Sequence, residues 1–204
     1  MTLIVEDPNL PETVDLDGRP ALLRSMTADD RRAVLRFARA LPEEDLLFLR
    51  TDITQEHVVD QWLRDLESGQ TQTVVAVEPS SSDGAERILG YSSLQLSESL
   101  WTRHLGEILL LVASDGRGHG LGGRLARQIL ELAKRQDLQK LVAQMTSTQR
   151  SAQTLFHSLG FIPEAMLHDW VIDREGRTHN LIMMSREVDL EEDFLPDETN
   201  PSAS

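Results

Sequence analysis

Residues 109–125 read LLLVASDGRGHGLGGRL and combine an apolar run, a glycine-dense turn and the beginning of a helix. The apolar run at residues 109–112 is typical of a buried strand. After the turn, Leu121, Leu125 and Ile129 recur at the spacing of one helical face, which predicts an amphipathic helix. The segment therefore predicts a strand, a tight turn and a helix in direct succession.

The turn has the chemistry of a phosphate site. Gly118, Gly120 and Gly122 let the backbone turn tightly and bring amide N–H groups close to a ligand. The first turn of the following helix has unpaired N–H groups and a partial positive charge, which together favour a phosphate or pyrophosphate. Arg117 adds a cation beside them. We predict that this turn grips a nucleotide cofactor.

Residues 118–123, GHGLGG, also satisfy the dinucleotide fingerprint G-x-G-x-x-G. That fingerprint expects an acidic residue about 20 residues further on, at the end of the next strand. The next expected strand, residues 138–145, ends in Met-Thr-Ser-Thr without an acid. The turn also lies past the middle of the chain, with no room behind it for a full doubly wound sheet. The context therefore disfavours a dinucleotide.

Three segments resemble the GNAT superfamily of N-acetyltransferases. Residues 117–122 resemble its acyl-CoA pyrophosphate motif, R/Q-x-x-G-x-G/A, and residues 149–161, QRSAQTLFHSLGF, are similar to its segment N-x-x-A-x-x-L-Y-x-x-L-G-F. The strand at residues 107–112 resembles the fourth strand of that superfamily. The pieces occur in family order, and the resemblance covers residues 20–187. Two positions depart from the pattern, with Gln149 in place of Asn and Phe156 in place of Tyr.

The resemblance implies that acetyl-CoA is the acyl donor. It places cofactor-binding groups on the strand, in the glycine turn and in the second motif, at Leu111, Val112, Arg117, Gly118, His119, Gly120, Leu121, Gly122, Gly123, Arg124, Gln149 and Phe156. Arg127 and Arg150 are further candidates for charge-assisted contacts with its phosphates. No metal is expected, because the six histidines form no i,i+4 or acid-flanked pair of the kind that binds zinc.

Glu107 is the expected catalytic residue. It is the only acid in the strand that leads to the glycine turn, and the resemblance implies a general base at this position. The apolar strand around a carboxylate would raise its pKa by desolvation, toward useful basicity. In the alternative interpretation Glu107 is exposed, solvated or paired with Arg103. Glu98 and His104, in the preceding loop, are the other candidates for the base.

The general acid is the point at which this chain departs from the family. The family often uses the tyrosine whose place Phe156 takes, and a phenylalanine ring has no proton to donate. The single tyrosine, Tyr91, belongs to a different expected strand. Thr148, Ser151 and His157 are possible replacements. Water-assisted release of the thiolate, slower turnover and lost catalysis all stay open.

The order of elements predicts an α+β fold with a mixed, mostly antiparallel central sheet flanked by helices in three α/β/α layers. The expected strands are residues 20–24, 73–77, 88–97, 107–112, 138–145, 165–172 and 178–186. Helices are expected from Thr27, around residues 46–49, and from Thr54, Leu121 and Ser151. In this division, residues 1–19 are a loose leader, residues 20–187 the acyltransferase domain, and residues 188–204 an acidic mobile tail.

Composition is typical of one soluble, cytoplasmic domain. The chain has 204 residues, 40% of them hydrophobic, which is enough for a sizeable core. It has no apolar run long enough to span a bilayer and no signal-peptide pattern at its start. The net charge of −14 argues against nucleic acid or an anionic membrane as a partner. Without cysteine, neither a disulfide nor an acyl-cysteine intermediate is available, so acyl transfer would have to be direct.

These features predict an enzyme that moves an acetyl group from acetyl-CoA to a primary amine by direct attack in a ternary complex. Glu107, the glycine turn and residues 137–141, DLQKL, resemble bacterial protein lysine acetyltransferases, so a protein lysine is the first acceptor considered and small amines come next. The alternative is an acyl-CoA-binding sensor or interaction module without turnover. The two differ in Glu107, which an enzyme needs for rate and a sensor does not. Nothing in the sequence indicates an oligomeric state.

Overall fold

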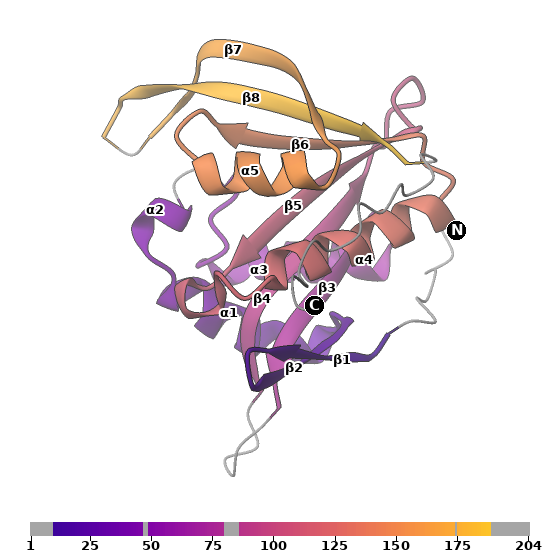
Figure 1. The fold of residues 1–204 in the computed structure, drawn as a ribbon, viewed down its shortest axis with the longest axis vertical. Helices are drawn as coiled ribbons and strands as arrows, with labels where there is room; N and C mark the ends of the chain where they lie inside the picture. Colours follow the sequence, from indigo (N-terminus) through magenta and orange to yellow (C-terminus); the bar gives the residue numbers. More distant parts are fainter. Residues whose placement is uncertain (1–9, 47–48, 80–85, 174, 189–204) are drawn as a thin grey trace, which may run out of the picture.

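One eight-stranded sheet forms the middle layer of the protein, with strand order β1-β2-β3-β4-β5-β6-β8-β7 (Figure 1). The computed structural model describes residues 10–46, 49–79, 86–173 and 175–188. The strands are β1 (Glu12–Leu16), β2 (Arg19–Ser25), β3 (Thr71–Glu78), β4 (Arg87–Leu96), β5 (Leu105–Val112), β6 (Lys140–Thr146), β7 (Ile162–Ile172) and β8 (Thr178–Glu187). The helices are α1 (Arg31–Ala40), α2 (Glu43–Leu46), α3 (Glu56–Glu67), α4 (Leu121–Arg135) and α5 (Arg150–Ser158).

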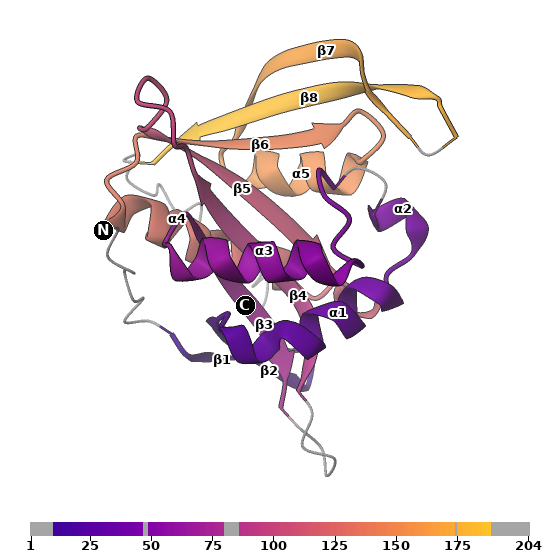
Figure 2. The same cartoon turned by 180° about the vertical axis from the view of Figure 1, so that it is seen from behind.

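Helices cover both faces of the sheet, which confirms the predicted three-layer α+β fold. Helices α4 and α5 lie on one face, and α1 and α3 lie on the other (Figures 1 and 2). The alternation of β3 shows how one strand serves both layers: Val74 and Ala76 pack in the core beneath α4, whereas Val75 and Val77 pack in the core beneath α1 and α3. A strand buried on both faces is apolar where both layers cover it, as β3 is from Val74 to Val77.

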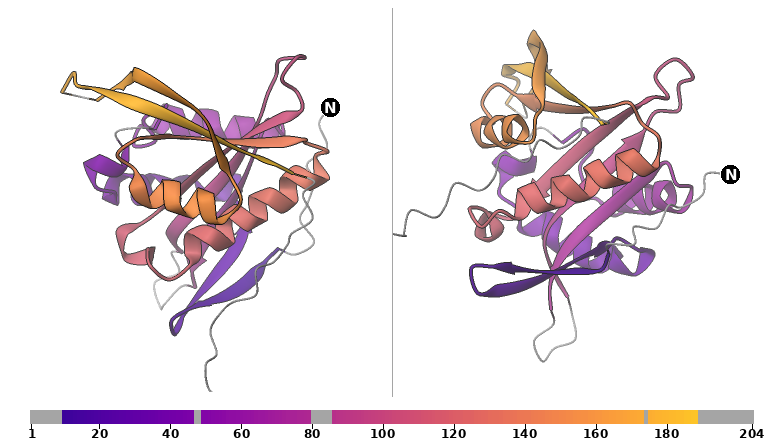
Figure 3. Two further views of the ribbon diagram at one scale, coloured as in Figure 1. Left: turned by 45° about the horizontal axis from the view of Figure 1, so that its top comes forward. Right: turned by 45° about the vertical axis from the view of Figure 1, so that its right-hand side comes forward.

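The pairing of β5 with β6 is the only parallel one in the described sheet, and it is short. It joins Leu105 to Lys140, Gly106 to Leu141 and Glu107 to Val142, and then it stops. Beyond that point β5 stays on β4 as far as Val112, whereas β6 stays on β8 as far as Thr146. The two strands therefore diverge and leave a V-shaped opening in the sheet (Figure 3).

Gly106 leaves room for core side chains where the two strands are still paired. A Cβ added there would lie 2.7 Å from Cδ1 of both Leu138 and Leu94, and 2.9 Å from Cδ2 of Leu141. These leucines belong to the core beneath α4 and are almost completely buried. The leucines therefore occupy the space that a side chain at position 106 would need.

The structure differs from the sequence analysis at both ends. Residues 1–19 were expected to be a loose leader, but β1 lies there and pairs with β2, because Val14 and Leu16 are buried in the core beneath α4. The short helix expected at residues 46–49 is α2, which ends at Leu46. Val188, the first residue of the expected tail, is fully buried, and residues 189–204 lie outside the described part of the chain. Across the described ranges, no helix is long and apolar enough to cross a membrane.

We predict that Gly106→Ala destabilises the protein by about 1–3 kcal/mol, because the added methyl group overpacks a full core. The measurement is the free energy of unfolding in urea, from the midpoint and slope of the transition. Gly123→Ala is the matched control. Its Cβ would lie 3.9 Å from Leu155 Cδ1, an ordinary contact, and alanine inside a helix is favoured over glycine by about 0.5–1 kcal/mol. Equal stability of the two variants would contradict the packing argument.

Candidate active site

The glycine turn between β5 and α4 leaves a cradle of free main-chain groups. Gly118 and Gly120 have φ angles of +83° and +76°, in the left-handed region that favours glycine. A Cβ added at either residue would meet nothing within 4 Å. Gly120 is the N-cap of α4, so the unpaired N–H groups of a 15-residue helix begin there. Open space beside a helix N-terminus fits the pyrophosphate of acetyl-CoA.

Gly122 lies in the first turn of α4 and allows close packing of the helix. A Cβ there would lie 3.1 Å from Cδ2 of Leu155 on α5 and 3.5 Å from Cδ2 of Leu110 on β5. The missing side chain thus allows the first turn of α4 to pack against both α5 and β5. This contact sets the cradle beside the opening between β5 and β6.

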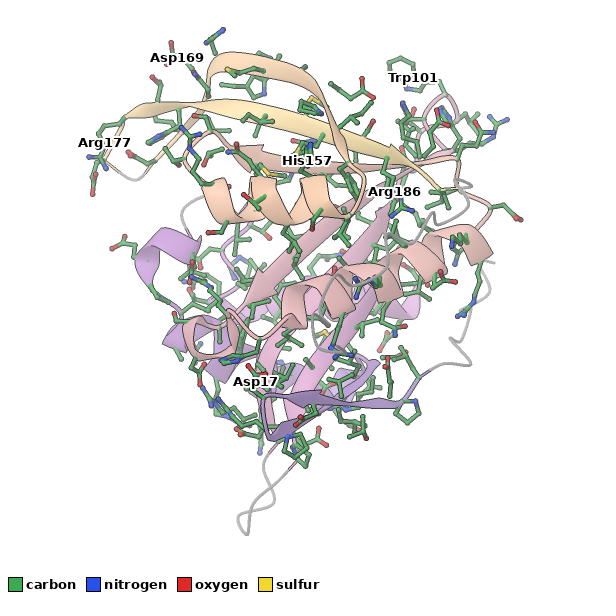
Figure 4. All side chains as sticks on the ribbon, viewed as in Figure 1. Asp17, Trp101, His157, Asp169, Arg177 and Arg186 are labelled. Carbon is green, nitrogen blue, oxygen red and sulfur yellow. The ribbon has the colours of Figure 1, made fainter. Side chains whose placement is uncertain are left out.

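Arg117 and His119 are held by other groups of the protein, whereas Arg124 is exposed. Arg117 donates from Nε to the carbonyl of Val112 at 3.0 Å and pairs with Asp45 of α2. His119 bonds through Nδ1 to Asp17, at the β1–β2 turn (Figure 4). Arg124 is exposed on the first turn of α4 and forms no ion pair within the described residues. Main-chain N–H groups and Arg124 are therefore the groups that are free to meet a phosphate.

Strand alternation decides which main-chain groups of β5 face the opening. Ala113 donates its N–H to the carbonyl of Leu89, on the β4 side. Successive residues of a strand point their main-chain groups to opposite edges, so Leu111 also faces β4, and Leu110 and Val112 face the edge that β6 has left. Of the two strand residues expected to bind the cofactor, Leu111 and Val112, only Val112 therefore has its main-chain groups at the open edge. Those of Leu110 lie at the same edge.

Glu107 lies at the last paired position of β5, at the apex of the opening. Its side chain is 24% exposed, and Oε1 accepts a contact from Nη2 of Arg50 at 2.8 Å. Burial raises the pKa of Glu107 above the ordinary glutamate value, and the charge and hydrogen bond of Arg50 partly oppose that rise. The result is a partly desolvated carboxylate with one exposed partner. Arg103, the partner considered from the sequence, donates to the carbonyl of Leu100 instead.

A cavity of about 550 Å³ opens in front of Glu107. Its floor is the face of β4 and β5 where Gln95 lies opposite Glu107 and Ser93 lies opposite Leu109. Helix α3 and residues 49–53 form its walls. The volume falls in the range of small-ligand sites. Sequence reasoning did not find Arg50, because its segment meets β5 only through the tertiary fold.

The cradle and the cavity lie on opposite faces of the sheet. Glu107 and Leu109 point toward the layer of α1 and α3, whereas Ile108 packs in the core beneath α4. A ligand held at the N-terminus of α4 can approach Glu107 only where the sheet is open. The opening between β5 and β6 starts at Glu107. A donor on one face and an acceptor on the other can therefore meet at this carboxylate.

The other candidates for the base lie outside the lining of this cavity. Glu98 and His104 belong to the loop that precedes β5, at the opposite end of the strand from the glycine turn. Figure 4 shows Trp101 of this loop at a corner of the molecule far from Asp17. Neither Glu98 nor His104 lines the cavity. Within the described residues, no three acidic or histidine side chains are arranged to hold a metal ion.

Side chains of the second motif, residues 149–161, bond and pack within the protein. Gln149 accepts the N–H of Thr146 at 2.8 Å through its side-chain oxygen, and so joins the end of β6 to the start of α5. Phe156 is buried and packs edge-to-face on Phe161, with ring centroids 5.0 Å apart. Thr148, a possible replacement for the acid, bonds to the hydroxyl of Thr146. The described contacts of Gln149 and Phe156 are therefore structural.

Comparison with protein families finds one match. The model of the Acetyltransferase (GNAT) family matches residues 35–161. This range begins inside α1 and includes α2, α3, the strands β3 to β6, the glycine turn, α4 and α5. A comparison with curated proteins found no match.

Solved structures share the fold at low sequence identity. Ribosomal-protein-alanine N-acetyltransferase from Brucella melitensis is 23% identical with a TM-score of 0.67, over 81% of this chain and 99% of that one. The structure of yncA from Salmonella typhimurium, with its cofactor acetyl-CoA, is 20% identical with a TM-score of 0.70, over 90% and 99%. Phosphinothricin acetyltransferase from Sinorhizobium meliloti, in complex with acetyl-CoA, is 20% identical with a TM-score of 0.67, over 82% and 88%.

We predict that Gly120→Val raises the Kd for CoA about tenfold. A β-branched residue disfavours the left-handed region by about 1–2 kcal/mol, so the backbone would move the N–H groups out of position. Isothermal titration calorimetry of the purified protein with CoA measures the change. Gly176→Val is the control, because Gly176 has a φ of +81° and equally open surroundings but lies in the β7–β8 turn. If Gly120→Val left the Kd for CoA unchanged, the cradle would not be part of the CoA-binding site.

Proposed function

The chain belongs to the GNAT family of acetyltransferases, and we propose that it acetylates a primary amine with Glu107 as general base. It is an N-acetyltransferase that uses acetyl-CoA. Acetyl-CoA supplies an acetyl thioester that is activated toward an amine. The observation that carries the proposal is the position of Glu107, which faces the cavity at the point where β6 leaves β5.

Glu107 acts on the proton of the acceptor. An ammonium group has no lone pair, so it must lose a proton before its nitrogen attacks the acetyl carbon. The carboxylate of Glu107 takes that proton, and its raised pKa makes it a better acceptor than an ordinary surface glutamate. The amine then attacks directly while both substrates are bound, the new C–N bond forms, and the C–S bond breaks.

Main-chain N–H groups stabilise the charge that develops on the acyl oxygen. Leu110 and Val112 direct theirs to the open edge of β5, where no strand competes for them. Fixed donors of this kind are worth more in a partly dry site than in water. The cradle at Gly118 and Gly120, with Arg124 beside it, holds the pyrophosphate on the other face of the sheet.

We assign no side chain to the general acid. Phe156 has no proton to give, and Tyr91 is almost completely buried, with its ring 4.8 Å from that of Trp62. Burial also raises the pKa of Tyr91, which keeps its hydroxyl neutral. A thiol has a pKa of about 8.5, so the thiolate is a tolerable leaving group that water protonates.

The acceptor that the sequence favours is a protein lysine, through the resemblance to bacterial protein lysine acetyltransferases. Small amines are the other class. Both would place the amine at Glu107 from the face of α1 and α3, where the cavity opens. Thiol release from acetyl-CoA, with a lysine-containing protein, peptides, amino acids, polyamines and aminoglycosides as acceptors, separates the two classes.

We predict that Glu107→Gln lowers kcat/KM about 10²- to 10⁴-fold, the usual effect of losing a positioned general base, and leaves the Kd for CoA unchanged. Thiol release and calorimetry measure the two quantities. Glu131→Gln is the control, because Glu131 forms a half-buried pair with Lys134 toward the other end of α4. Full activity of Glu107→Gln would assign the base elsewhere, and CoA binding without release by the wild type would favour a sensor.

The pH profile gives an independent test. The base works only when ionised, so kcat/KM should fall as the pH drops through the pKa of Glu107, which burial places above the ordinary glutamate value. On the acidic side of the profile, kcat/KM should fall about tenfold per pH unit. This dependence should disappear in Glu107→Gln. A profile of kcat/KM against pH, at matched ionic strength, measures it. If kcat/KM of the wild type and of Glu107→Gln fell in the same way at acidic pH, Glu107 would not be the base.

A further inference from the structure

We propose that the acceptor is a free α-amino acid with an apolar or aromatic side chain, whose carboxylate binds Arg50 while its amine faces Glu107. The inference rests on the proposed function and deepens it by naming the substrate class. It identifies Arg50 as a specificity-determining residue and prefers a small acceptor to a protein lysine.

The argument starts from the two opposite charges on the wall of the cavity. Arg50 and Glu107 lie 2.8 Å apart, between Nη2 and Oε1. An α-amino acid carries its ammonium and carboxylate on one carbon, so it matches such a pair with both of its charges. Its carboxylate takes the place of Glu107 at Arg50, and its ammonium takes the place of Arg50 at Glu107. Guanidinium and carboxylate form strong charge-assisted hydrogen bonds.

Arg50 is available for this exchange. Its side chain is 56% exposed and belongs to the segment at residues 49–53, which lines the cavity. The other arginine of the cavity, Arg64, is engaged, because it donates twice to Oε1 of Gln61, at 3.1 and 2.6 Å. Gln61 in turn donates to Asp65. Arg50 is therefore the cation that can bind an anionic group beside the base.

Other amines match the pair less well. The side-chain amine of a protein lysine satisfies Glu107 but brings no anion to Arg50. A polyamine brings a second positive charge toward Arg50, which is unfavourable at short range. An amino acid amide has the same shape as the acid but lacks the negative charge. These differences make the carboxylate the feature to test.

The rest of the cavity favours an apolar or aromatic side chain. Trp62 and Tyr91 lie together in its lining, with ring centroids 4.8 Å apart. The polar atoms behind them already have partners, since Trp62 donates Nε1 to Thr73 at 3.1 Å and Thr73 bonds to Ser93 at 2.8 Å. Trp62 and Ser93 therefore have no hydrogen bond to seek from a ligand, and the paired rings offer it apolar contact.

The test compares each acceptor with its uncharged analogue. Phenylalanine, leucine, methionine and tryptophan are offered with acetyl-CoA, each beside its carboxamide, together with a lysine peptide blocked at its N-terminus. For at least one of the four we expect kcat/KM about 10- to 100-fold above that of its amide and of the peptide, the usual effect of one charge-assisted contact.

Variants at Arg50 connect this preference to the residue. Arg50→Gln should raise KM for the preferred amino acid about tenfold or more, with KM for its amide changed less than about twofold, because only the acid loses a contact. Arg50→Lys should restore part of the difference. Arg64→Gln is the matched control and should keep the ratio of acid to amide. An unchanged Kd for CoA shows that each variant is folded.

The outcomes separate this inference from the proposed function. Equal rates with acids and amides, or a preference for the lysine peptide, would overturn the carboxylate site and leave Glu107 as the base. A preference for the acid that survives in Arg50→Gln would overturn the role of Arg50. No thiol release with any amine would overturn both proposals.

Discussion

β5 and β6 are parallel neighbours over three residue pairs, and the place where this pairing ends controls the rest of the site. A sheet that stayed closed would use the main-chain groups of Leu110 and Val112 for its own ladder. Because β4 holds β5 and β8 holds β6, the strands separate and leave those groups for a substrate. Next to Glu107, three leucines fill the space beside Gly106 in this last paired segment.

The electrostatics of Glu107 meet two requirements of the general base that we propose. A carboxylate in full contact with water is a weak proton acceptor, and one held tightly by a buried cation is weaker still. Burial raises the pKa of Glu107, and its partner Arg50 is more than half exposed. A surface ion pair contributes little to stability. The pair can therefore be exchanged for contacts with a substrate without loss of the fold.

Features encoded by neighbouring residues could be predicted from the sequence, and features that depend on long-range pairing could not. The strand, glycine turn and helix at residues 109–125, with Glu107 before them, follow from local periodicity and from glycines that face open space. Val112 is distinguished from Leu111 only by the ladder with β4. β1 has only two apolar residues, Val14 and Leu16, and these find their core only in the fold. Arg50 meets Glu107 across 57 positions of sequence.

The two faces of the sheet determine the kind of mechanism that this fold permits. The cradle proposed for the phosphates belongs to the layer of α4, and the cavity of Glu107 belongs to the layer of α1 and α3. Donor and acceptor therefore do not compete for space, and both can be bound when the amine attacks. A relay through the protein would need a nucleophile at the opening, and the chain has no cysteine to supply a thiolate there. Direct transfer through the opening is the route that this arrangement favours.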